Sequence, residues 1–196
     1  MFDLPCILFA GGKSSRMGQD KSLLPFGKSP SLAQYQYDRL KQLFSNVYIS
    51  AKSREKFNFN PHVIEDPVNC DFAPTAGFVA AFEKLANDRI FVLSVDTPFV
   101  DAPIIQNLLD ADALYYDAVI CKTPSGIHPM VGIYHRSLLD KLQRMLNEGD
   151  HRLGKLLSNS KTHYIQFENE EYFSNLNHPH EYEEAVSRYN DKNKPK

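Results

Sequence analysis

The sequence predicts one three-layer α/β domain with a mostly parallel but mixed central sheet. Its 196 residues are 42% hydrophobic and 23% charged, which is typical of a single globular domain with a buried core. Short apolar runs alternate with helical patterns over the first half of the chain, as expected for βαβ units. No apolar run in the sequence approaches the length of a membrane-spanning helix.

The apolar runs are the expected strands. Up to residue 122 they cover residues 4–10, 47–51, 62–65, 89–95 and 118–122. Helical periodicity between them covers residues 31–44, 75–87 and 102–111. We expect helices on both faces of the sheet, with ligands bound beyond the carboxyl ends of its strands.

The second half is less regular and is expected to complete a substrate pocket. We expect a strand over residues 127–134, for which antiparallel pairing is an option, and another over 162–167. Helices are expected over residues 138–146, 152–157 and 178–189, the last with Pro179 in its first turn. We assign residues 1–190 to a single domain and expect the polar residues 191–196 to form a frayed tail.

Charge and cysteine content narrow the function. The chain carries 22 lysines and arginines against 24 acids, a formal net charge of -2. Without a basic excess, nucleic-acid binding is not expected and a small-molecule partner is favoured. Cys6, Cys70 and Cys121 are too far apart for a zinc motif, so buried thiols in a reducing compartment are expected. The acid Asp3, where a signal peptide would be basic, favours a cytoplasmic protein without a membrane partner.

A glycine-rich, basic loop follows the first expected strand. Residues 9–21 read Phe-Ala-Gly-Gly-Lys-Ser-Ser-Arg-Met-Gly-Gln-Asp-Lys. Glycines let the backbone approach a phosphate closely, and Arg16 and Lys21 can neutralise a polyphosphate. The spacing fits neither the P-loop nor the dinucleotide fingerprint. The loop therefore indicates another kind of phosphate site, with a basic surface loop as the alternative.

A carboxylate stands at the end of the strand expected over residues 89–95. Asp96 follows this apolar run and precedes Thr97 and Pro98. A carboxylate at the carboxyl end of a strand, beside a phosphate site, is well placed to hold Mg²⁺. Capping of the next helix is the structural alternative for Asp96, but Asp101 lies better for that cap.

These segments carry a resemblance to a known family. The loop after the first strand and the Asp-Thr-Pro segment resemble the NTP-transferase superfamily with a Rossmann-like nucleotidyltransferase fold, and within it the molybdenum cofactor guanylyltransferases. The resemblance implies that Phe9, Ala10 and Gly11 line the base. It also implies that Gly12 and Arg16 hold phosphates, that Lys21 contacts the triphosphate and that Asp96 binds the metal.

A third segment resembles the Asn-x-Asn-Thr-Pro stretch near the end of such guanylyltransferases. It reads Asn175-Leu-Asn177-His178-Pro179 here, with His178 in place of the usual Thr. The resemblance implies that Asn175 and Asn177 help position the metal and the acceptor. From the residues alone, Asn177 would be an N-cap of the last helix, and both roles can coexist.

Weaker matches lie between these segments. Residues 73–77 read Ala-Pro-Thr-Ala-Gly and resemble in part the family's Gly-Pro-Leu-Ala-Gly turn, which opens the next helix against the nucleotide. Asp66 matches an aspartate that contacts guanosine, through either the base or the ribose, and Ser50 stands where the family has an asparagine near the ribose. His128 belongs to a His-Pro pair that resembles the family's acceptor-side strand. Arg152 either reaches the acceptor's phosphate or is a solvated arginine at a helix start.

The resemblance implies a reaction and its substrates. It is the Mg²⁺-dependent transfer of GMP from GTP to the terminal phosphate of molybdopterin or its molybdenum form, with release of pyrophosphate. Transient contacts with cofactor-supplying proteins or molybdoenzymes are further expected partners. Gly11 favours GTP, since the cytidylyltransferase relatives usually carry alanine there. The alternatives are transfer of CMP to the same pterin, transfer to a sugar phosphate, or a non-catalytic nucleotide-binding module.

Overall fold

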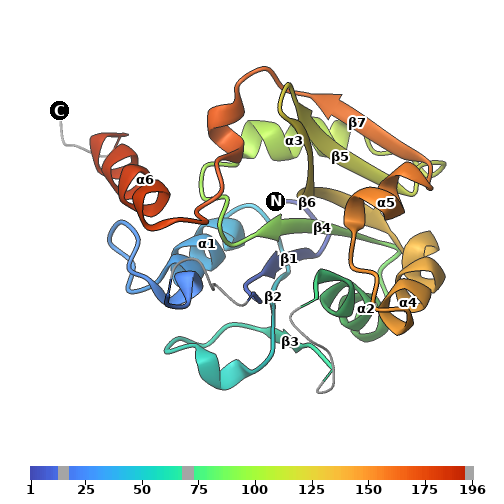
Figure 1. The fold of residues 1–196 in the computed structure, drawn as a ribbon, viewed down its shortest axis with the longest axis horizontal. Coiled ribbons are helices and arrows are strands. Elements are labelled where there is room, and N and C mark those ends of the chain that lie inside the picture. The colour runs from blue at the N-terminus through green and yellow to red at the C-terminus, as the bar shows by residue number, and fades with distance from the viewer. Residues whose placement is uncertain (13–17, 68–72, 193–196) are drawn as a thin grey trace.

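The computed structural model describes residues 1–12, 18–67 and 73–192. In this part of the chain, seven strands form one mixed sheet in the order β3-β2-β1-β4-β6-β5-β7 (Figure 1). β6 runs antiparallel to its neighbours β4 and β5, and the remaining neighbouring strands pair in parallel. The prediction of a mostly parallel, mixed sheet is confirmed. The strands are β1 (Cys6–Phe9), β2 (Val47–Ala51), β3 (Val63–Glu65), β4 (Arg89–Ser94), β5 (Ala118–Thr123), β6 (Gly126–His135) and β7 (Thr162–Gln166).

Helices cover both faces of the sheet, which completes the predicted three layers. One apolar cluster joins the sheet to α1, α3 and α6, and a second joins it to α2, α4 and α5. In Figure 1, α2 and α4 lie side by side on one flank, and α6 lies on the opposite flank. The helices are α1 (Leu32–Lys41), α2 (Pro74–Lys84), α3 (Ala102–Asp110), α4 (Leu139–Asn147), α5 (Leu153–Ser158) and α6 (Pro179–Lys192).

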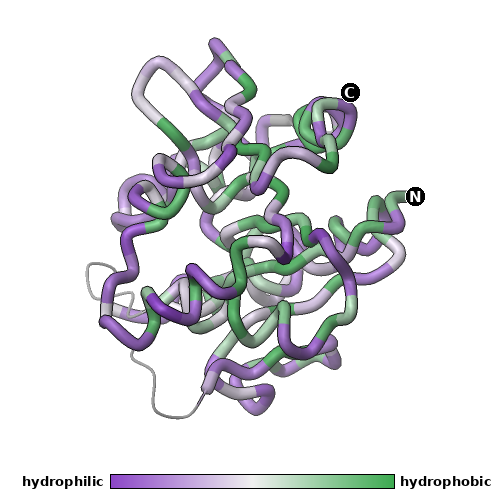
Figure 2. Tube along the Cα trace, turned by 90° about the vertical axis from the view of Figure 1, so that its right-hand side faces the viewer, coloured by the Kyte–Doolittle hydropathy of each residue, from purple (hydrophilic) through white to green (hydrophobic). Residues whose placement is uncertain are grey.

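The central strand β1 explains why the predicted apolar runs lack alternation. Cys6 and Leu8 belong to the first cluster, whereas Ile7 and Phe9 belong to the second. A strand buried on both faces needs apolar side chains at every position. Figure 2 shows hydrophobic residues concentrated in the interior of the molecule, with hydrophilic residues mostly toward its periphery.

The described cysteines behave as expected of buried thiols. Cys6 and Cys121 are fully buried, and this burial raises the pKa of each thiol. Cys70 lies outside the described residues.

The ends of the helices differ from the predicted ends by a few residues. α1 ends at Lys41 and α2 at Lys84, each three residues before the predicted end. α6 continues to Lys192, so the structure describes the first two residues of the predicted tail as helix. None of the described helices is long and apolar enough to cross a membrane.

Gly132 on β6 lies opposite Ile120 on β5. A Cβ atom at this position would overlap the carbonyl oxygen of Val119 and lie 2.6 Å from Cδ1 of Ile120. Backbone on the facing strand cannot move aside as a flexible side chain can. Glycine is therefore required here by close approach of the two strands.

We predict that Gly132→Ala lowers the free energy of unfolding by about 1–3 kcal/mol, because it overpacks this contact. Gly154→Ala is the matched control, since its Cβ would lie 3.8 Å from Ile127 in ordinary contact and within helix α5. The control should leave stability unchanged or raise it by up to about 1 kcal/mol. Urea unfolding of the three proteins makes the comparison, and equal stabilities would contradict the packing argument.

Candidate active site

The parallel pairing of β1, β2 and β4 brings their carboxyl ends level. Phe9 at the end of β1 is in register with Ser50 on β2 and with Ser94 on β4. Asp66 follows the end of β3, the next strand on the β2 side. The segments that the sequence singled out as functional therefore leave the sheet at one edge.

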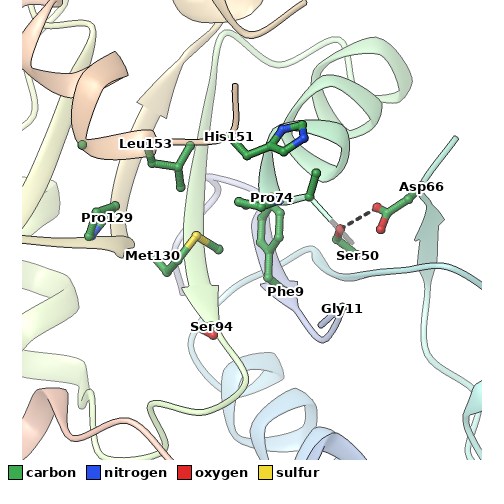
Figure 3. A pocket seen from close by; sticks show the side chains of 12 residues that line it. Phe9, Gly11, Ser50, Asp66, Pro74, Ser94, Pro129, Met130, His151 and Leu153 are labelled. Atoms are coloured by element: carbon green, nitrogen blue, oxygen red, sulfur yellow. Dashed lines mark hydrogen bonds between the residues drawn. The ribbon is translucent and has the colours of Figure 1, made fainter. Parts of the chain in front are cut away.

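A cavity of about 350 Å³ opens at this edge. In Figure 3, Ser50 and Asp66 lie on one side of the Phe9 ring, whereas Met130 and Leu153 lie on the other. The wall thus combines an apolar floor with a few polar groups, as small-molecule sites commonly do. The lining residues are Phe9, Gly11, Ser50, Asp66, Ala73, Pro74, Ser94, Pro129, Met130, His151, Leu153 and Gly154.

Asp66 is the acidic group of this wall. Its Oδ1 accepts a hydrogen bond from the Ser50 hydroxyl at 3.0 Å. Burial raises the pKa of the Asp66 carboxyl, and the Ser50 hydrogen bond opposes this shift. The arrangement leaves Oδ2, which lies 3.6 Å from where a Cβ on Gly11 would be, on the side of the glycine-rich loop.

Gly77 in α2 allows the helix to sit close to this polar pair. A Cβ atom on Gly77 would overlap the Ser50 hydroxyl and lie 2.6 Å from Cε1 of Phe9. The sequence did not single out Gly77 as a site residue. Gly77 ends a segment, residues 73–77, whose sequence resembles the turn by which the family opens a helix against the nucleotide. Its contacts with side chains 27 and 68 residues away in the chain depend on the packing of α2.

Three further side chains meet beyond the end of β4. The Lys21 ammonium group forms an ion pair with the Asp96 carboxylate and donates to Oδ1 of Asn177 at 3.0 Å. The partners of Lys21 are 75 and 156 residues distant in the chain. We call Lys21, Asp96 and Asn177 the cation cluster.

Local capping interactions position the outer members of the cation cluster. Lys21 opens a short 3₁₀ helix, η1 (Lys21–Leu23), which Asp20 caps by accepting from the Ser22 N–H at 3.0 Å. The Glu181 carboxylate accepts from the N–H groups of Asn177 and His178 at 2.6 and 2.8 Å. Glu181 thus caps α6, and the Asn177 side chain bonds Lys21 instead of serving as the N-cap.

Two side chains of helix α1 bind the backbone of the segment from Val95 to Val100, which contains Asp96. Gln36, which is fully buried, donates from Nε2 to the carbonyl of Val95 at 3.2 Å. Arg39 donates to the carbonyl of Val100. These two bonds flank Asp96 on either side along the chain. Asp101 accepts from the Ile104 N–H at 3.2 Å, which confirms it as the cap of α3.

The cation cluster presents two oxygen donors to one cation. A carboxylate and an amide oxygen are hard ligands of the kind that Mg²⁺ takes, usually together with water and substrate phosphates. No group of three His, Cys, Asp or Glu side chains that could hold a metal occurs among the described residues. The donor set of Asp96 and Asn177 fits a magnesium ion that also binds a nucleotide.

The glycine-rich loop is described at its two ends. Ala10 is buried and donates from its N–H to the Ser50 carbonyl at 3.0 Å. Gly11 is exposed toward the cavity and Gly12 is partly exposed. Arg16, the predicted phosphate ligand, lies outside the described residues.

The residues expected on the acceptor side lie off the cavity wall. The His128 ring stacks on Phe173 with centroids 4.6 Å apart, bonds Thr123 at 2.9 Å, and has its pKa lowered by burial. Arg152 is 74% exposed and forms a two-bond ion pair with Asp150, which holds the pKa of that carboxyl below its usual range.

Asn175 lies apart from Asn177. It is exposed and lines a separate surface hollow beside α6. Asn177, by contrast, accepts a hydrogen bond from Lys21, which in turn pairs with Asp96. The neighbours of the other candidates, Pro129 and His151, line the cavity instead.

His151 was not among the predicted site residues. Its Nδ1 lies 2.6 Å from the Thr75 hydroxyl, which ties the segment before α5 to the first turn of α2. The contact depends on the packing of two segments that are 76 residues apart.

Comparison with known proteins identifies relatives over nearly the whole chain. The model of the MobA-like NTP transferase domain matches residues 6–164. A molybdenum cofactor guanylyltransferase of Campylobacter jejuni is 38% identical over 95% of this chain and 97% of its own length. One from Helicobacter pylori is 37% identical, over 94% of this chain and 88% of its own.

A solved structure has the same fold. Molybdopterin-guanine dinucleotide biosynthesis protein A from Archaeoglobus fulgidus superposes with a TM-score of 0.81 over 96% of this chain and all of its own, at 18% identity. The resemblance inferred from the motifs and the predicted fold class are both confirmed. The chain therefore belongs to the MobA-like NTP transferase family, which is a family of nucleotidyltransferases.

Proposed function

We propose that this protein transfers GMP from GTP to the terminal phosphate of molybdopterin or its molybdenum form, with release of pyrophosphate. The observation that carries the proposal is the cation cluster, which lies beyond the end of the strand whose Ser94 lines the cavity. Relatives named for guanylyl transfer to the molybdenum cofactor support the choice of nucleotide and acceptor. We expect the reaction to take place in the cytoplasm, with transient contacts to proteins that supply the pterin or receive the product.

The cavity is the proposed site of the base and ribose. Phe9 and Gly11 line it with Ala10 between them in the chain, and Asp66 can accept hydrogen bonds from guanine or from ribose hydroxyls. Ser50 holds Asp66 and stands near the ribose. Gly12, Arg16 and Lys21 are the proposed phosphate ligands.

Asp96 and Asn177 are the proposed protein ligands of Mg²⁺. The Lys21 ammonium group already binds between their oxygens, which supports a site suited to a cation. When bound, the metal would neutralise charge on the triphosphate. Lys21 and the metal would bind the same two oxygens. Lys21 is therefore expected to bind the phosphates instead when both substrates are present.

The acceptor needs no strong general base. A phosphate monoester has a second pKa of about 6, so the acceptor oxygen is already anionic at neutral pH. The difficulty is repulsion between two anions, which Arg16 and Lys21 relieve electrostatically. His128 and Arg152 remain proposed acceptor contacts, with Arg152 leaving Asp150 to bind a phosphate. Asn175 and Asn177 complete the proposed acceptor side.

We predict that Asp96→Ala lowers kcat on the order of 10²-fold or more while the fold stays intact, because it removes the carboxylate of the cation site. The control is Asp101→Asn, five residues away, since asparagine caps a helix as well as aspartate does. Pyrophosphate release at saturating Mg²⁺ measures both variants. An Asp96→Ala enzyme as active as the control would contradict the metal assignment.

A screen of the four nucleoside triphosphates with Mg²⁺ and purified molybdopterin tests the function itself. We expect pyrophosphate release with GTP and much less with CTP, because Gly11 leaves room for a two-ring base. An alanine side chain at position 11 would make only an ordinary van der Waals contact with Asp66. Any effect of the substitution on activity would therefore come from its contact with the bound nucleotide. Gly11→Ala should therefore lower kcat/KM for GTP more than for CTP, by about 1–3 kcal/mol. Equal use of CTP by the wild type would overturn the guanylyl assignment.

A further inference from the structure

Lys56 joins two segments on either side of the glycine-rich loop. Its ammonium group donates to the Ala10 carbonyl at 2.6 Å and pairs with the Asp20 carboxylate at 2.8 Å. The Lys56 side chain is 18% exposed. Neither the motifs nor the comparisons assign it a role. We call Lys56, Ala10 and Asp20 the Lys56 bridge.

The Lys56 bridge connects the end of strand β1 to the turn that carries Lys21, a proposed phosphate ligand. Ala10 is 3% exposed and is bonded through its N–H to β2, so its carbonyl is fixed on the sheet. Asp20 uses its other oxygen to accept from the Ser22 N–H and the Ser22 hydroxyl, at 3.0 and 2.7 Å. Asp20 thereby fixes the turn of η1 that opens with Lys21. Lys56 consequently sets the distance between the end of β1 and Lys21.

Lys56 itself is held by its own segment. It ends a second 3₁₀ helix, η2 (Arg54–Lys56), in which Ser53 accepts from the Glu55 N–H at 3.1 Å. The Arg54 N–H donates to the Glu65 carboxylate at 2.8 Å, which ties η2 to β3. An ammonium group on a fixed segment loses less side-chain entropy in forming an ion pair than one on a mobile surface chain.

The charge of Lys56 also suits the site. The Asp20 carboxylate would repel a triphosphate, and Lys56 neutralises it within a partly buried pair. The pKa of Asp66 is raised by burial, and the positive charges of Lys52 and Lys56 oppose that shift. Lys52 shares this effect on Asp66, so a variant of Lys52 measures how much a nearby positive charge contributes by itself.

We propose that Lys56 is a positioning residue for the nucleotide, which holds Lys21 at the correct distance from the end of β1 and cancels the charge of Asp20. The proposal rests on the proposed binding of a nucleoside triphosphate at this edge of the sheet. Lys56 does not touch the reacting atoms, so its contribution falls on nucleotide affinity.

We predict that Lys56→Met raises the Kd and the KM for GTP about tenfold, while kcat changes less than about twofold; tenfold corresponds to about 1.4 kcal/mol. The probe for affinity is a fluorescent GTP analogue with Mg²⁺, and pyrophosphate release gives kcat and KM. Lys52→Met is the matched control and should change the Kd less than about threefold. Lys56→Arg should restore much of the affinity, since it keeps the charge and the donors.

A substitution of Asp20, the other charged member of the Lys56 bridge, tests the same ion pair from its other side. Asp20→Asn keeps an oxygen for the cap of η1 and removes the ion pair. If the bridge acts as one unit, the double variant Lys56→Met, Asp20→Asn should lose less affinity than the product of the two single losses. Far-ultraviolet circular dichroism checks that each variant is folded.

Two results would overturn the proposal. An unchanged Kd in Lys56→Met would remove any role in nucleotide binding. Equal losses of GTP affinity in Lys52→Met and Lys56→Met would show that any nearby positive charge has the same effect, without a role for the Lys56 bridge. A wild type that binds and uses CTP instead of GTP contradicts only the proposed nucleotide choice, and the same variants are then compared with a fluorescent CTP analogue.

Discussion

The contact of the Lys21 ammonium group with Asp96 and Asn177 is the interaction on which the candidate site depends. It draws together the loop after β1, the end of β4 and the segment before α6, which lie far apart in the chain. A partly buried carboxylate requires a cation beside it, because an unpaired buried charge is costly. The same requirement that organises the protein without ligands makes this point of the fold suitable for a metal ion.

The rest of the architecture brings these groups to one place and keeps them there. Parallel register sets the ends of β1, β2 and β4 level, so that the cavity and the cation cluster share one edge of the sheet. Helix α1 supports the Asp96 segment through two hydrogen bonds to its backbone carbonyls. A backbone bond from Leu176 to the Asp96 carbonyl, at 3.1 Å, fixes the Asn177 segment to the same point.

Features that depend on a local sequence pattern could be predicted from the sequence. Features that depend on contacts between distant parts of the chain could not. The strands were predicted because buried strands are continuously apolar, and Asp96 was singled out because Asp101 already accounted for the helix cap. The choice between two roles for Asn177 depended on Glu181, whose carboxylate takes the cap only in the folded protein. Lys56 carries no motif, since its partners come from the loop after β1. Gly77 belongs to a segment that resembles a family turn, but its contacts with Ser50 and Phe9 arise only when α2 packs on the sheet.

Affinity for Mn²⁺ in the absence of nucleotide tests the central claim most directly. If Lys21 and a metal ion share the oxygens of Asp96 and Asn177, removing the ammonium group frees them for the ion. Electron paramagnetic resonance of free Mn²⁺ should then show about tenfold tighter binding by Lys21→Met than by the wild type, a gain of about 1.4 kcal/mol. Lys28→Met, which removes an exposed lysine elsewhere, should bind as the wild type does. Equal or weaker binding of Mn²⁺ by Lys21→Met would contradict the account.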